Sequence, residues 1–235
     1  MGDTAPSNLT LRVISSAVMA PIAIGIAWLG SWPFVAFWTV AAAIVLWEWD
    51  RLVRAAPDRS LVGFIGWMMA GLVYAGAMLL APVILRHDAA LGFVAILFLF
   101  AVVWITDIAA YFAGRTFGGP KLWPAVSPKK TWSGAIGGTI GGVIAGLLVA
   151  RFCGLAIAPM LLLVAVVLSV ISQAGDLLES SIKRHFGAKD ASQLIPGHGG
   201  LMDRLDGFLT AAVAAVMVGL LRGGFAEPAR GLLVW

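Results

Sequence analysis

Long uninterrupted apolar runs recur along the whole sequence, and they constrain the fold more than any other feature. A helix needs about 20 predominantly apolar residues to cross a bilayer. Seven segments meet this length, namely residues 11–30, 33–49, 61–85, 90–112, 134–152, 156–175 and 206–225. The runs are too long for barrel strands and do not alternate, so helices are the structure that satisfies their backbone in lipid. The sequence predicts an all-α polytopic membrane protein with about seven transmembrane helices.

Composition supports a membrane protein with one domain. The chain is 60% hydrophobic and 12% charged, whereas a soluble domain carries roughly 25% charged residues. No linker rich in Pro, Ser or charge divides residues 1–235, so we expect a single integral membrane domain. We expect N-terminal helices over 11–112, and C-terminal helices and loops carrying the chemistry over 113–235. The first run stays apolar through Leu29 without a clear cleavage site, which predicts a retained anchor.

Basic residues predict the orientation of the chain. In the seven-span topology, the N-terminus and the connections on its side of the membrane hold 12 of the 16 Lys and Arg residues. The segments on the other side hold the remaining 4. Basic residues accumulate on the cytoplasmic side, which places the N-terminus in the cytoplasm and the protein in the inner membrane. Two long loops, 113–133 and 176–205, then face the cytoplasm. The basic residues form no stripe, so nucleic acid is not an expected partner. The single cysteine excludes an internal disulfide.

Carboxylates in the C-terminal half suggest a metal site. If the chain after Gly175 is helical, Asp176, Glu179 or Ser180, and Lys183 share one face. Asp203 and Asp206 lie three residues apart at the start of the last apolar run, so both can point the same way. Hard oxygen ligands favour Mg²⁺, which keeps waters for substrate phosphates to displace. The alternative is that the last two acids cap the helix.

Two loops suggest phosphate binding. The glycines of Pro196-Gly197-His198-Gly199-Gly200 let the backbone approach an anion, although such a loop is also typical of a simple turn. His198 either contacts phosphate or packs in the loop. The stretch 127–131, SPKKT, offers two cations and two hydroxyls to a polyanion. Its lysines also suit a loop lying against anionic headgroups.

Two further features lie within the apolar runs. Asp107 is charged at membrane depth, which favours a functional role, although Arg115 lies two helical turns away as a candidate partner. Glycines recur every fourth residue over 134–146, which predicts close packing of that helix against a neighbour.

The stretch KRHFGAKDASQLIPGHGGLMDRLD, residues 183–206, closely resembles the signature of phosphatidate cytidylyltransferases, also called CDP-diacylglycerol synthases. Gly175-Asp176-Leu177, SPKKT at 127–131 and DIAAYFAGR at 107–115 resemble the same family. The likeness covers roughly the C-terminal half. Ser133 stands where relatives often have Glu or Gln, and Gly207 where they often have Ser. Neither departure removes a proposed ligand, but the hydrogen bonds that the relatives' Glu, Gln or Ser side chains would make near the site are not expected here.

This resemblance implies that CTP and phosphatidic acid react to give CDP-diacylglycerol and pyrophosphate. It also implies a requirement for Mg²⁺ and a second cation such as K⁺. Its expected partners are membrane lipids and a second copy of the chain in a homodimer. Metal binding is assigned to Asp176, Asp203 and Asp206. Catalytic roles are assigned to Lys183, Arg184, Lys189, Asp190, His198 and Arg204. Substrate binding is assigned to Asp107, Ser127, Lys129, Lys130, Thr131, Gly197, Gly199 and Gly200.

Two other functions fit parts of the pattern. An ion-coupled transporter would explain an acid within the membrane, but the acids gather at one side and no inverted repeat is apparent. A CDP-alcohol phosphotransferase also uses aspartates at the membrane surface with Mg²⁺, but its DGxxAR-type spacing is absent from this sequence.

Overall fold

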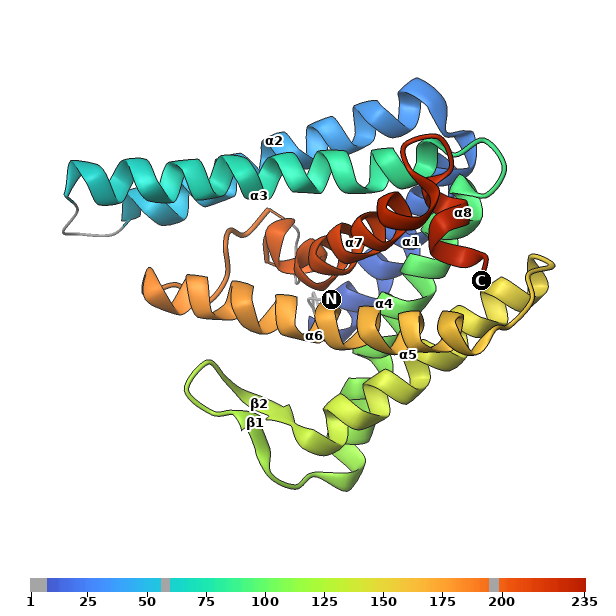
Figure 1. Ribbon diagram of the computed structural model, residues 1–235. Coiled ribbons are helices and arrows are strands. Elements are labelled where there is room, and N and C mark those ends of the chain that lie inside the picture. Colours follow the sequence, from blue (N-terminus) through green and yellow to red (C-terminus); the bar gives the residue numbers. More distant parts are fainter. Residues whose placement is uncertain (1–7, 56–59, 195–198) are drawn as a thin grey trace, which may run out of the picture.

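The computed structural model describes residues 8–55, 60–194 and 199–235, with side chains from residue 17 onward, and it is mostly helical (Figure 1). Within these residues, six helices are long and apolar enough to cross a membrane. They are α2 (Ser31–Ala55), α3 (Leu61–His87), α4 (Gly92–Phe117), α5 (Trp132–Phe152), α6 (Pro159–His185) and α7 (Met202–Gly223). The prediction of a helical membrane protein is confirmed at this level.

The first predicted span is helix α1 (Asn8–Leu29). The part of α1 with described side chains contributes an apolar stretch of 13 residues, Ala17–Leu29, which is shorter than a span requires. The count of seven transmembrane helices therefore stays a prediction. A short helix that the sequence did not predict, α8 (Pro228–Leu233), packs against α7 near the end of the chain.

The two predicted long loops are shorter than expected. Helix α4 continues to Phe117 and α6 continues to His185, so much of 113–133 and 176–205 is helical. Helices extend past their apolar runs here because polar residues at helical spacing continue the same faces. Between α4 and α5, strands β1 (Lys121–Trp123) and β2 (Ser127–Thr131) pair as an antiparallel hairpin. SPKKT was predicted as a loop, and the chain is not entirely α-helical.

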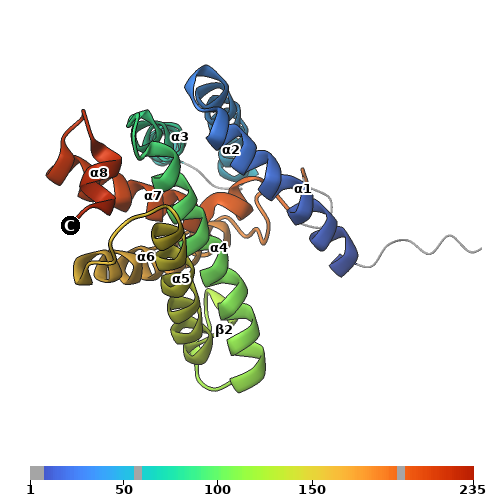
Figure 2. The ribbon, with the colours of Figure 1, turned by 90° about the vertical axis from the view of Figure 1, so that its right-hand side faces the viewer.

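Helices α4 and α5 form the closest helix pair and carry the hairpin at one end (Figure 2). Gly134, Gly138, Gly142 and Gly146 are buried along α5. A methyl group on Gly138 would lie 2.8 Å from the carbonyl oxygen of Thr106 in α4, so only hydrogen fits at that contact. The predicted glycine packing face is confirmed. Thr106 also reaches α6, because its hydroxyl lies 2.7 Å from that of Ser169.

Helix α2 is held firmly against two neighbours. The Trp38 indole stacks on the Phe208 ring of α7 with centroids 5.1 Å apart. The Trp49 indole donates a 2.8 Å hydrogen bond to the carbonyl oxygen of Trp67 in α3. The C-terminal ends of α2, α4 and α6 lie at the same end of the bundle as the N-terminal ends of α3, α5 and α7 (Figure 1). Polar segments far apart in sequence therefore meet there.

Candidate active site

A cavity of about 690 Å³ lies at this end of the bundle, between α4, the hairpin, α5, α6 and α7. Its described lining contains five cationic and five acidic side chains, so the formal charges balance. The cationic residues are Arg115, Lys129, Lys130, Lys183 and Arg204. The acidic residues are Asp107, Asp176, Asp190, Asp203 and Asp206. Ten charged groups in one cavity of an apolar bundle make this cavity the candidate active site.

Lys183 lies at the centre of a buried charge cluster. Its side-chain nitrogen forms an ion pair with Glu179, one turn earlier in α6, at 3.1 Å, and another with Asp203 of α7. Glu179 is 1% exposed and Lys183 is 7% exposed. The predicted helical face is thus confirmed, because α6 continues through Asp176, Glu179 and Lys183. The cluster joins α6 to α7 at the cavity wall.

Asp203 holds the chain that precedes it. Its Oδ1 accepts from Lys183, and its Oδ2 accepts from the backbone N–H groups of Ala191 at 2.9 Å and Gly200 at 2.8 Å. A carboxylate has about four lone-pair sites, so roughly one remains for a metal ion. Gly199 has a φ of +82°, a conformation that favours glycine, and a methyl group there would lie 2.9 Å from Asp203 Oδ2.

The other two predicted metal ligands line the same cavity. Asp176 forms an ion pair with Lys130 of β2, which attaches the hairpin to α6. Asp206 accepts a 2.7 Å hydrogen bond from the backbone N–H of Gly207. Among the described residues, no three His, Cys, Asp or Glu side chains already form a metal-binding group. The donor set still suits Mg²⁺, which commonly takes one or two carboxylates and completes its shell with water and substrate phosphate.

Residues of the hairpin and α4 have distinct positions. Thr131 caps α5, because its hydroxyl accepts from the N–H of Gly134 at 3.1 Å. Ser127 begins β2 outside the described cavity lining. Arg115 donates to the Tyr111 hydroxyl at 2.9 Å, and the ion pairs described include none between Arg115 and Asp107. The alternative partner considered for Asp107 is thus engaged elsewhere.

The two positions that depart from the family pattern have local explanations. The Ser133 hydroxyl bonds the carbonyl oxygen of Gly118 and lies 3.0 Å from the Thr131 hydroxyl, so it joins α5 to the end of α4. A methyl group on Gly207 would lie 2.9 Å from the carbonyl oxygen of Ser172. Glycine at this position therefore allows α7 to approach α6 closely.

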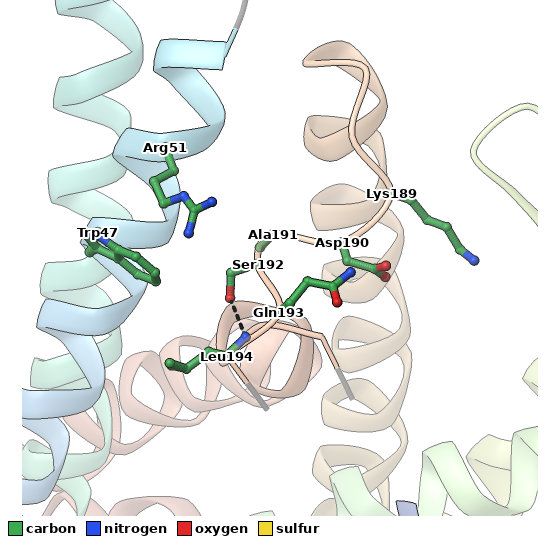
Figure 3. Close-up of a pocket in the computed structure, with 8 residues that line it drawn as sticks. All are labelled: Trp47, Arg51, Lys189, Asp190, Ala191, Ser192, Gln193 and Leu194. Atoms are coloured by element: carbon green, nitrogen blue, oxygen red, sulfur yellow. Dashed lines mark hydrogen bonds between the residues drawn. The ribbon is translucent and has the colours of Figure 1, made fainter. Parts of the chain in front are cut away.

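A second cavity of about 560 Å³ lies between α2 and the segment 189–194 (Figure 3). Trp47 and Arg51 point from α2 toward this segment. Asp190 lines both cavities, whereas Lys189 lines only the second. Arg184 donates to the carbonyl oxygen of Ala188 at 2.8 Å and so closes the end of α6. Gly197 and His198 lie outside the described residues.

Glu48 of α2 is a residue that sequence reasoning missed. It is 0% exposed and accepts hydrogen bonds from the Ser192 hydroxyl at 2.5 Å, from Leu201 N at 2.9 Å and from Met202 N at 2.7 Å. The available signal was an acid within the apolar run 33–49, where an ionisable group is costly unless it has partners.

Comparison with known proteins identifies the family of this chain. Residues 59–221 match the model of the cytidylyltransferase family. The chain belongs to this family. A phosphatidate cytidylyltransferase of Brucella suis biovar 1 is 40% identical over 262 residues, covering 94% of this chain and 96% of the relative. A phosphatidate cytidylyltransferase of Staphylococcus saprophyticus is 49% identical over 115 residues, covering 48% of this chain and 44% of the relative. The matched family region contains both cavities except for Trp47 and Arg51.

Proposed function

We propose that this protein transfers the cytidylyl group of CTP to phosphatidic acid, giving CDP-diacylglycerol and pyrophosphate. A phosphate oxygen of phosphatidic acid forms a bond to the α-phosphorus of CTP. The bond from that phosphorus to the oxygen bridging the α- and β-phosphates breaks, and pyrophosphate leaves with the electron pair. The attacking phosphate is already anionic at neutral pH, so the reaction needs positioning and charge neutralisation more than a general base.

The observation that carries the proposal is the charged cavity at one end of an apolar bundle, in a chain whose relatives are phosphatidate cytidylyltransferases. A nucleoside triphosphate needs a polar site, whereas a diacyl lipid needs access from the bilayer. A cavity formed by the ends of membrane-spanning helices offers both. A transporter would instead be expected to bind its substrate near the bilayer midplane.

The cationic side chains contact the phosphates in this proposal. Lys129 and Lys130 line the cavity from β2, while Arg204 lines it from the first turn of α7, so cations come from two different elements. Lys183 acts differently, because it is buried between Glu179 and Asp203 and therefore fixes the wall itself. Arg184, Lys189 and Asp190 keep their predicted catalytic roles as hypotheses, as do Asp107, Ser127, Thr131 and the loop glycines for substrate binding.

Mg²⁺ would be held by Asp176 and Asp206, with the remaining lone pair of Asp203 as a third donor. The lining charges balance without substrate, so two phosphate substrates bring an excess of negative charge into the cavity. When bound, the divalent ion would neutralise part of that charge and orient the phosphates. A second cation such as K⁺ and a homodimer belong to the proposal through family resemblance, and size measurement in detergent tests the dimer.

The enzyme is proposed to lie in the inner membrane with this site facing the cytoplasm. The single cysteine offers a direct test, because Cys153 is exposed at the end of α5 opposite the hairpin. A maleimide that cannot cross membranes should label Cys153 from outside in intact spheroplasts. Labelling that requires permeabilised cells would place the site on the other face.

The reaction itself is tested with labelled CTP and phosphatidic acid, with and without Mg²⁺, on the purified full chain. We expect label in the lipid and one pyrophosphate released per CDP-diacylglycerol formed. Consumption of CDP-lipid with release of CMP would instead indicate a CDP-alcohol phosphotransferase. Solute uptake into proteoliposomes without CTP turnover would indicate a transporter. Asp203→Asn should fold but lose incorporation, and near-normal activity would remove Asp203 from the site.

A further inference from the structure

The buried carboxylate of Glu48 joins α2 to two described parts of the later chain, Ser192 and the neighbouring residues Leu201 and Met202. It accepts from the Ser192 hydroxyl at 2.5 Å. It also accepts from the backbone N–H groups of Leu201 at 2.9 Å and Met202 at 2.7 Å. These three donors come from positions 144 to 154 residues later in the chain. The contact is therefore set by tertiary structure alone.

The fit around this carboxylate is tight. A methyl group on Gly200 would lie 2.5 Å from Glu48 Oε1 and 3.0 Å from Oε2, so glycine is required for the backbone to pass the carboxylate. A buried carboxylate is costly unless hydrogen bonds compensate it. All three described hydrogen bonds to Glu48 come from Ser192, Leu201 and Met202, so the carboxylate and these residues stabilise each other.

The residues that Glu48 contacts adjoin the candidate active site. Ser192 lies in the wall of the second cavity, opposite Trp47 and Arg51 of α2 (Figure 3). Met202 begins α7, which carries Asp203, Arg204 and Asp206. Glu48 therefore sets the position of α7's first turn relative to α2. Helix α2 is itself fixed by the Trp49 to Trp67 hydrogen bond.

We infer that Glu48 is a positioning residue for the proposed reaction, which acts by holding Ser192 and the first turn of α7 in place against α2. The expected effect of Glu48 on catalysis rests on the proposed function, whereas its effect on the position of Ser192, Leu201 and Met202 is independent of any reaction. Misplacement of reacting groups by about 1 Å can lower a rate by about 100-fold.

Glu48→Gln is the informative variant because glutamine has the same shape. Glu48 accepts hydrogen bonds on both oxygens, whereas a glutamine side chain has one oxygen and an NH₂ group. Either orientation of the amide places a donor against a donor, so at least one hydrogen bond is lost. Asp50→Asn is the matched control, because Asp50 lies two residues away on α2 and contacts only Arg54 among the hydrogen bonds described.

Hydrogen exchange of the full chain in detergent, read by mass spectrometry, tests the structural part. In Glu48→Gln, peptides containing Leu201 and Met202 should exchange about tenfold faster or more, as loss of a hydrogen bond to a charged group implies. Peptides from α4 and α5 should exchange as in the unchanged protein. Unchanged exchange at Leu201 and Met202, or faster exchange across all helices, would overturn the inference.

Kinetics test the catalytic part. In Glu48→Gln, kcat should fall about 100-fold. The KM for CTP should change by a smaller factor, because Lys129 and Lys130 lie on the hairpin and only Arg204 of the proposed phosphate contacts lies on the first turn of α7. Faster hydrogen exchange at Leu201 and Met202 combined with a normal kcat would overturn the positioning role. If Glu48→Gln fails to fold, Ser192→Ala removes only one of the three contacts and should shift exchange and kcat in the same direction by less. If the unchanged protein shows no CTP turnover, the proposed function fails. The exchange result still decides whether Glu48 holds Leu201 and Met202 in place.

Discussion

Replacing Lys183 with methionine should destabilise the protein strongly, because it leaves two buried carboxylates without their shared cation. Lys183 contacts Glu179 at 3.1 Å and also pairs with Asp203. The side chains of Glu179 and Asp203 are 1% and 6% exposed, so water cannot replace the ammonium group. Removing one partner of a buried ion pair typically costs about 3–5 kcal/mol.

This cost converts to a measurable shift in thermal unfolding. A chain of this size loses roughly 2–4 °C in Tm for each kcal/mol, so Lys183→Met should lower Tm by about 6–20 °C. Tryptophan fluorescence during heating of the protein in detergent provides the assay, since the chain contains 10 tryptophans. Lys121→Met is the control, because Lys121 is exposed on β1 and its loss should cost less than about 0.5 kcal/mol.

A double variant isolates the electrostatic cause. Adding Glu179→Gln to Lys183→Met removes one unpaired buried charge, so at least half of the lost Tm should return. Transfer of the cytidylyl group of CTP to lipid should not return, because Asp203 still lacks the Lys183 ammonium group. A Lys183→Met protein with unchanged Tm, or a double variant less stable than the single one, would refute the reasoning.

Three further predictions follow from the packing and the cavity. Gly142→Val should destabilise the bundle by about 1–3 kcal/mol or more, because the added side chain would overlap α4. Gly76→Ala is the control: a methyl group at Gly76 would have no atom within 4 Å, so Tm should stay nearly unchanged. Asp206→Asn should raise the Mg²⁺ concentration for half-maximal CTP incorporation, and an unchanged Mg²⁺ titration would remove that carboxylate from the metal site. Lys130→Met should raise KM for CTP about tenfold or more, while Lys121→Met should not, and equal effects would indicate a general loss of surface charge.

Local sequence patterns predicted the features that depend on helix periodicity. The face shared by Asp176, Glu179 and Lys183 follows from spacings of three, four and seven residues, and α6 confirms it. The glycines at every fourth position predicted a close helix contact, and α5 packs against α4 along them. Both patterns repeat within one segment, so no knowledge of the partner was needed to recognise them.

Pairing between distant segments was not predictable in the same way. The strand β2 exists because Lys121 and Trp123 of β1 pair with it, and nothing within SPKKT alone indicates that partner. Glu48 lies in a helix that sequence reasoning treated only as a membrane span. Its role becomes visible only when Ser192 and Met202 come within hydrogen-bond distance.

The sequence by itself determined that the chain is a bundle of apolar helices, that acids and bases are concentrated in the stretch 175–206, and that those acids suit phosphate chemistry. Tertiary structure decided how each acid is used: Asp203 binds Lys183 and two backbone N–H groups, Asp176 pairs with Lys130, and Glu48 holds the segment before α7. The physical reason is one of range. Hydrophobicity and helical periodicity are properties of neighbouring residues, whereas the partner of a buried charge is chosen by the packing of helices far apart in the chain.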